Sequence, residues 1–237
     1  MTKAEQYLSI FQKECGQTYP EIDEFEKACG FAVDRARLEA AAYPLACPLK
    51  INPPSWQHGR ILYAKARQAL AKNPPPSGLL VDIGTAKGFS AVVLSWAAED
   101  AGWEGGVASI DVMDPESRQK RNSYLEGDFK FLTVPEFVDP FRSWKVLVTF
   151  HGCGSVPYLR SLKKTTHIPL AFVDGKHDRH TVHQEARLIR DHQKRGDTII
   201  FDDIQIPAVA QAVKDLSGYK AEYLVAGFRK YAIATRI

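Results

Sequence analysis

The sequence has 237 residues, of which 45% are hydrophobic and 25% are charged, and its net charge is +3. This composition is typical of a globular protein that folds without disulfides or a structural metal. The first residues are too polar for a signal peptide, and no stretch approaches the roughly 20 apolar residues that span a bilayer. We therefore expect a cytoplasmic protein, and the small, scattered charge argues against a nucleic-acid or membrane partner.

The pattern of the chain changes at the prolines of residues 74–76. Residues 1–57 are mostly helical, and residues 58–72 place apolar side chains at helical spacing. After the prolines, short apolar segments alternate with helical ones. The predicted strands are 79–83, 107–112, 145–150, 169–174 and 198–203, and the predicted helices are 90–101, 181–194 and 207–216.

Strands that alternate with helices indicate a parallel sheet with helices on both faces, a doubly wound α/β fold. The chain ends with two more predicted strands, 222–227 and 229–237, joined by a tight turn at Gly227. Parallel strands cannot be joined so closely, so the last strand should run antiparallel. Residues 1–57 and 113–144 fall outside the alternation, and we expect them to cover the open end of the sheet, where such folds bind ligands.

A glycine-bearing loop follows the first strand, in VDIGTAKGFSA (81–91). Glycines at Gly84 and Gly88 allow a ligand to approach the backbone, and the following helix directs N–H groups toward an anion. The dinucleotide fingerprint G-x-G-x-x-G is absent, and residues 85–87 would crowd a pyrophosphate. A purely structural turn is the alternative interpretation.

Two further strand ends carry groups suited to an adenosine ligand. Asp111 closes the second strand, where a carboxylate accepts hydrogen bonds from ribose hydroxyls, although a merely solvated acid would also fit there. The loop 151–159 offers small residues and free backbone groups to an adenine edge, but glycine and serine are common in any loop.

Three carboxylates, Asp174, Asp202 and Asp203, follow the fourth and fifth strands. Neighbouring parallel strands lie about 4.8 Å apart, so these acids should converge. Oxygen ligands of this kind suit a hard divalent ion such as Mg²⁺, because like charges this close need a cation between them. Helix capping is the alternative role for these acids.

Zinc is the less favoured metal. The nearby histidines, His177, His180 and His183, show no H-x-x-x-H spacing. The cysteines show no C-x-x-C spacing, and we expect all of them to be unpaired thiols: Cys15, Cys29, Cys47 and Cys153.

With these motifs in place, the chain resembles the class I S-adenosylmethionine-dependent methyltransferases. Within that class it is most similar to the branch related to catechol O-methyltransferase and the metal-dependent sugar O-methyltransferases. The resemblance runs from about Gly59 to the C-terminus and is carried by VDIGTAKGFSA, SIDVMD, PLAFVDGKHDRHTV and GDTIIFDDIQIPAVAQAV. It implies a Rossmann-like sheet of seven strands with an antiparallel last strand, in a domain of residues 58–237 that follows an N-terminal helical cap of residues 1–57.

The resemblance also implies which residues bind the ligands. The cofactor S-adenosyl-L-methionine would be held by Gly84, Ala86 and Gly88 beside its methionine part, Asp82 at its amino group, Asp111 at its ribose, and Gly154 and Ser155 beside its adenine. The divalent metal, Mg²⁺ or another ion, would be held by Asp174, Asp202 and Asp203.

The catalytic base is the point at which this chain departs from the relatives. Sugar-methylating relatives often carry a second acid where this chain has Lys176, and catechol-type enzymes carry a catalytic lysine where it has His177. Histidine has an ordinary pKa near 6.5, and a nearby cation lowers it further, so a neutral imidazole is available to accept a proton. We therefore favour His177 as the base over Lys176.

The favoured function is O-methylation of a small molecule. Two alternatives stay open: an NAD-dependent oxidoreductase on a similar sheet, and a non-catalytic binding protein that keeps the fold. The sequence does not identify the methyl acceptor, and it leaves open whether the protein forms a homo-oligomer.

Overall fold

The computed structural model describes residues 3–46, 54–71, 77–118 and 131–237 of the chain. The prolines 74–76, Cys47 and part of the expected cover, residues 119–130, lie outside these ranges. Among the described residues, Cys15, Cys29 and Cys153 form no disulfide. No helix in the described part of the chain is both long and apolar enough to cross a membrane.

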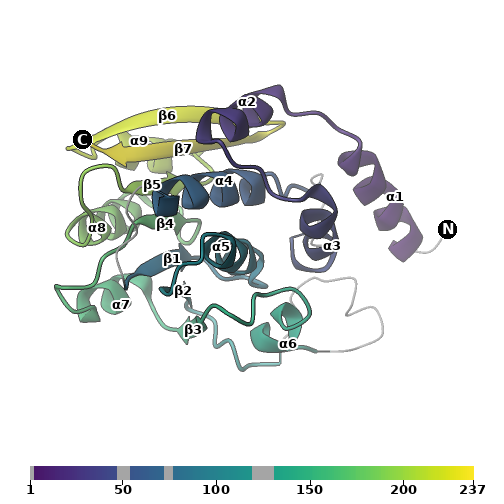
Figure 1. The fold of residues 1–237 in the computed structure, drawn as a ribbon, viewed down its shortest axis with the longest axis horizontal. Helices are drawn as coiled ribbons and strands as arrows, with labels where there is room; N and C mark the ends of the chain where they lie inside the picture. Colours follow the sequence, from purple (N-terminus) through teal and green to yellow (C-terminus); the bar gives the residue numbers. More distant parts are fainter. Residues whose placement is uncertain (1–2, 47–53, 72–76, 119–130) are drawn as a thin grey trace.

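Helices precede the sheet, as predicted for the N-terminal region (Figure 1). Asp34 caps the third of them, because its side chain accepts a hydrogen bond from the backbone N–H of Arg37 at 2.7 Å. The second has a proline in its first turn and ends at Gly30, whose φ of 80° reverses the chain. The four helices are α1 (Lys3–Cys15), α2 (Pro20–Cys29), α3 (Arg35–Leu45) and α4 (His58–Ala71).

Seven strands form one sheet in the order β3-β2-β1-β4-β5-β7-β6. The first five pair in parallel, and β7 lies antiparallel between β5 and β6. The doubly wound sheet and its antiparallel last strand are therefore confirmed. The strands are β1 (Leu79–Ile83), β2 (Gly106–Asp111), β3 (Val148–Gly152), β4 (Leu170–Val173), β5 (Thr198–Phe201), β6 (Tyr219–Ala226) and β7 (Arg229–Arg236).

Alternate residues of each strand face two separate cores, which explains the apolar runs in the sequence. Phe172 of β4 packs into the core on the side of α4 and α5, whereas its neighbours Ala171 and Val173 pack on the opposite side, against the helices that follow β3, β4 and β5. The remaining helices are α5 (Phe89–Asp100), α6 (Val134–Val138), α7 (Ser155–Ser161), α8 (Arg179–Arg190) and α9 (Pro207–Lys214).

The structure differs from the sequence prediction around β3. The predicted strand 145–150 begins only at Val148 and continues to Gly152, and most of the predicted loop 151–159 is helix α7. Pro157 is the third residue of this helix, a position in the first turn where its missing N–H breaks no helical hydrogen bond. A helix of seven residues is too short to show a reliable periodicity, so the sequence pattern did not reveal it.

A buried ion cluster joins the N-terminal helices to the rest of the fold. The side chain of Arg60 on α4 is only 1% exposed and pairs with both Glu26 and Asp23 of α2. Two acids thus satisfy a guanidinium that would otherwise be buried without a partner.

This cluster generates a prediction about stability. Arg60→Met leaves Glu26 buried without its cation and should lower the free energy of unfolding by about 3–5 kcal/mol. Arg35 is a matched control, because it pairs with the same Asp23 at 3.3 Å but has a side chain that is 46% exposed. Arg35→Met should cost about 0–1 kcal/mol. Urea denaturation of both variants is the measurement, and equal losses would contradict the assignment.

Candidate functional site

A cavity of about 580 Å³ opens at the carboxyl ends of β1, β2 and β4. Strand β1 lies between β2 and β4, so the chain order reverses there, and this is where open α/β sheets bind ligands. Most residues that the sequence assigned to a cofactor meet in this cavity. They are Gly84, Ala86, Asp111, Gly154 and Ser155, and the cavity also contains Asp174.

The glycine loop has a backbone that only certain residues tolerate. Gly84 has φ of 100°, and a Cβ at this position would overlap the backbone carbonyl of Asp174. Gly88 has φ of 88°, and a Cβ there would strike the side chain of Val138. Ala86 also has a positive φ, 47°. The first glycine therefore brings the loop against β4, while Gly88 lies outside the set of cavity residues and lets α5 begin close to α6.

Asp111 holds the loop and lines the cavity. Its Oδ2 accepts a hydrogen bond from the backbone N–H of Ala86 at 3.0 Å, and its Oδ1 accepts one from Met113 at 3.0 Å. A carboxylate oxygen has two lone pairs, so each oxygen can accept a second bond from a ligand hydroxyl.

Asp82 lies beneath the cavity rather than on its wall. The residue is fully buried in β1, where its Oδ1 accepts from Ser90 at 2.7 Å and its Oδ2 from Ser109 at 2.5 Å. Burial raises the pKa of Asp82 to about 7. Ser109 also contacts Thr85 at 2.7 Å. Among the described residues, Asp82 therefore links β1, β2, the loop and α5.

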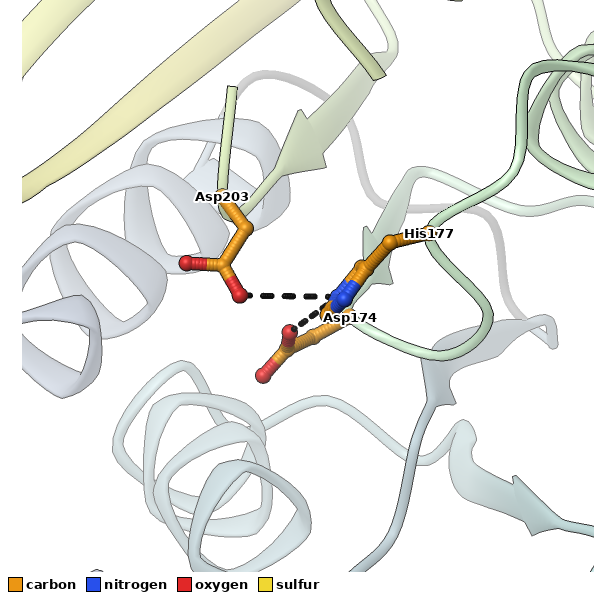
Figure 2. A group of neighbouring side chains, drawn as sticks. All are labelled: Asp174, His177 and Asp203. Carbon is orange, nitrogen blue, oxygen red and sulfur yellow. Dashed lines mark hydrogen bonds and ion pairs between the residues drawn. The ribbon is translucent and has the colours of Figure 1, made fainter. Parts of the chain in front are cut away.

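Figure 2 shows a second group of side chains, of which Asp174 also lines the cavity. Asp174 follows β4, Asp203 follows β5, and His177 lies in the loop after Asp174. The Nε2 atom of His177 is 3.4 Å from Oδ1 of Asp174 and 3.5 Å from Oδ2 of Asp203. One ligand atom from each residue lies within 4.8 Å of the others, the spacing of a metal-ligand set.

Asp202 faces a different partner. It is 1% exposed, and its Oδ2 accepts a hydrogen bond from Arg229 Nη1 at 2.9 Å. The same nitrogen donates to Oδ1 of Asp203 at 2.8 Å. Burial raises the pKa of Asp202, and the carboxylates raise the pKa of Arg229 despite its own burial. The sequence analysis did not single out Arg229, because its position at the start of the last strand carries no motif.

A change in backbone direction separates the two adjacent acids. Asp203 has φ of 54°, a left-handed conformation that is costly for a residue with a side chain. Both acids pair with Arg229, but only Asp203 also lies beside His177. Such strain often accompanies a functional site.

The two candidate bases lie in different surroundings. The side chain of Lys176 is 74% exposed and pairs with Asp178 at 3.0 Å. The pKa of His177 is raised, chiefly by its hydrogen bond to Asp174. The carboxylates around His177 therefore favour its protonated form. The sequence analysis expected a neutral imidazole, because it assumed a bound cation that would lower the pKa of His177.

The donor set fits a divalent cation. Two carboxylates and one imidazole provide oxygen and nitrogen ligands, which suit Mn²⁺, Fe²⁺ or Zn²⁺ as well as Mg²⁺. The candidate ligand set therefore contains His177 in place of Asp202, whereas the sequence analysis named only carboxylates.

Comparison with known proteins identifies relatives of this fold. Residues 81–204, more than half of the chain, match the family described as "Methyltransferase domain". No curated protein matches significantly in sequence. The match confirms the resemblance that the sequence motifs indicated.

Solved structures share the architecture at low identity. TomG from Streptomyces achromogenes, an O-methyltransferase of tomaymycin synthesis solved with SAM, is 15% identical over 100% of this chain and 99% of its own, with a TM-score of 0.57. An O-methyltransferase from Bacillus cereus solved with SAH is 14% identical over 99% and 100%, with a TM-score of 0.53. The TDP-rhamnose 3'-O-methyltransferase CalS11 of calicheamicin biosynthesis is 15% identical over 76% and 78%, with a TM-score of 0.51. At these identities the likeness shows a common fold.

The contact between the glycine loop and β4 generates a prediction. Gly196 has φ of 94° but nothing near its missing Cβ, so Gly196→Ala should cost only the left-handed backbone strain, about 1–2 kcal/mol. Gly84→Ala should cost about 1–3 kcal/mol in addition, because the methyl group displaces the backbone of Asp174. Denaturation curves of the two variants give the difference, and an equal loss would show that the loop and β4 move apart freely.

Proposed function

Since the chain belongs to the family of methyltransferase domains, we propose that it transfers the methyl group of S-adenosyl-L-methionine to a hydroxyl oxygen of a small molecule, with the help of a divalent metal. The observation that carries this proposal is the position of Asp174. It lines the 580 Å³ cavity and also belongs to the group with His177 and Asp203. A cofactor in the cavity and an acceptor at that group would therefore be neighbours.

The cavity residues divide among the parts of the cofactor. Gly84 and Ala86 line the cavity where the methionine part would lie, and Asp111 offers two carboxylate oxygens to the ribose. Gly154 and Ser155, at the start of α7, lie beside the adenine. Asp82 would support the cofactor indirectly, because its hydrogen bonds fix the glycine loop beneath the cavity. Gly88 would also act indirectly, because it lets α5 begin close to α6.

Asp174, His177 and Asp203 would hold the metal. A bound divalent ion supplies positive charge that lowers the pKa of an acceptor hydroxyl and orients it. Asp202 and Arg229 hold Asp203 in place from the opposite side. Catalysis would depend on His177, either as a ligand or as the base, while Lys176 lies at the edge of the cofactor cavity and pairs with Asp178.

The N-terminal cap, residues 1–57, would shape the acceptor site of the domain formed by residues 58–237. A second cavity, of about 470 Å³, lies between Tyr19 and Pro20 of the cap and the turn at Gly227 and Phe228. This turn directly precedes Arg229, whose guanidinium pairs with Asp203, so the chain connects the cavity wall to the acidic group. The cytoplasmic location, the lack of nucleic-acid and membrane partners, and the oligomeric state stay predictions from the sequence.

Cofactor binding is tested by calorimetric titration with S-adenosylhomocysteine. Asp111→Ala should weaken binding by about 1.5–3 kcal/mol, because hydrogen bonds to a charged group are lost. Asp114→Ala is the matched control, since Asp114 follows the same strand but does not line the cavity. Unchanged affinity in Asp111→Ala would remove this residue from the site.

The same titration separates the alternatives. An oxidoreductase would bind NADH and not S-adenosylhomocysteine. A non-catalytic binding protein would bind S-adenosylhomocysteine, but it would not consume S-adenosylmethionine with any of a panel of hydroxylated acceptors.

The metal group generates a further prediction. Turnover should vanish after chelation and return with Mn²⁺ or Mg²⁺, and Asp203→Asn should raise the metal concentration required. His177→Ala should lower kcat by about 10²–10⁴-fold with little change in S-adenosylmethionine affinity. Lys176→Ala, the neighbouring control, should lower kcat much less, because Lys176 lines the cavity but does not belong to the group of Asp174, His177 and Asp203.

Metal binding to His177→Ala then distinguishes the two roles of this residue. A ligand role predicts weaker Mn²⁺ binding, and a base role predicts unchanged binding with the same loss of kcat. Full turnover after exhaustive chelation would contradict the metal proposal, and a crippled Lys176→Ala beside an active His177→Ala would contradict the assignment of His177.

A further inference from the structure

A buried acid on α8 lines the cofactor cavity and has no role in the function described so far. Glu185 is only 1% exposed. It lies on the apolar side of the helix with Val182, Ala186 and Ile189, which pack into the core beneath the sheet. A carboxylate at a core position is costly unless its oxygens are satisfied.

Only one of the two carboxylate oxygens of Glu185 has a partner. Oε1 accepts a hydrogen bond from the hydroxyl of Ser155, the first residue of α7. Oε2 is buried and has no hydrogen-bond partner, and no cation pairs with Glu185, among the residues that the structure describes. Burial raises the pKa of Glu185 to about 7. An acceptor left unsatisfied in this way is what a site shows when its ligand supplies the missing donor.

The position of Glu185 indicates which part of the ligand it meets. Helices α7 and α8 pack against each other, and the cavity wall here includes Gly154 and Ser155 at the start of α7 and Thr181, Gln184 and Glu185 on α8. This is the wall that the proposed function assigns to the adenine. Adenine carries one exocyclic amino group at C6, a hydrogen-bond donor on an otherwise accepting edge.

We propose that Glu185 is a specificity-determining residue, whose free carboxylate oxygen accepts a hydrogen bond from the 6-amino group of the bound nucleoside. The inference rests on the proposed function, because it requires an adenosine ligand in this cavity. A 6-oxopurine would place a carbonyl oxygen against the ionised carboxylate, so that an acceptor would replace the donor opposite Oε2. A site that is built to pair with one group rejects the analogue that lacks it, because its own buried group stays unpaired.

The experiment compares S-adenosylhomocysteine with its deaminated analogue S-inosylhomocysteine, which carries a carbonyl at C6 and a proton on N1. Calorimetric titration is carried out at about pH 8.5, above the pKa of Glu185, so that its carboxylate is ionised. Wild type should bind the adenine compound at least about tenfold more tightly, as expected for one hydrogen bond to a buried charged group. Glu185→Gln carries an amide that can donate to the 6-oxo group, so it should reduce this ratio to about threefold or less. Arg187→Gln, an exposed position on the same helix, should keep the wild-type ratio.

The alternative role for Glu185 is to anchor Ser155 only. In that case Glu185→Gln would weaken both ligands by the same factor and leave their ratio unchanged, which would overturn the proposal. The wild-type ratio is a second test that needs no variant, and equal binding of the two ligands would also overturn it. If wild type binds neither compound, the proposed function fails, and this outcome is distinct from equal binding.

Discussion

The close contact between Gly84 and the backbone of Asp174 determines how the rest of the site is arranged. The end of β1 is tied to both neighbouring strands, because Gly84 N–H donates to Ile110 of β2 and Asp174 N–H donates to Ile83 of β1, each at 2.9 Å. No side chain fits between the loop and β4. The glycine loop and the carboxylate of Asp174 are therefore positioned by the same few backbone atoms, and the cofactor cavity cannot be displaced from the acidic group without breaking the sheet at this point.

Buried acids surround this contact, and each is stabilised in a different way. Two serine hydroxyls satisfy Asp82, the guanidinium of Arg229 pairs with Asp202, and Ser155 satisfies half of Glu185. Burial raises the pKa of all three carboxyls, so their partners decide whether each is charged near neutral pH. The carboxylates of Asp82 and Asp202 have hydrogen-bond partners within the chain, which suits residues that position other residues. One carboxylate oxygen of Glu185 has no hydrogen-bond partner among the described residues, which suits a residue that binds a ligand.

The sequence predicted the strands, their direction and the edge of the sheet where ligands bind, because apolar runs and glycine turns are local signals. It did not distinguish Asp202 from Asp203. These two residues are neighbours in the sequence and share Arg229, but Asp203 has a left-handed backbone and lies beside His177, whereas Asp202 is buried. Glu185 could have been found, since a lone acid three residues after Val182 and four before Ile189 interrupts the apolar face of a helix. Arg229 could not have been found, because its partners Asp202 and Asp203 lie 27 and 26 residues away in the sequence.

The terminal hairpin connects the cap to the acidic group. Glu21 of α2 accepts a hydrogen bond from the backbone N–H of Val225 on β6, and α2 lies beside this strand in the fold (Figure 1). The hairpin then turns at Gly227, and Arg229, two residues later, pairs with Asp202 and Asp203. A continuous series of contacts thus runs from the cap through β6 and β7 to the end of β5. Arg60 also fixes α2 to α4 by a buried ion cluster, so the cap is held both by α4 and by β6. Its position relative to Asp174, His177 and Asp203 is consequently determined by the fold, because Arg229 contacts Asp203 directly.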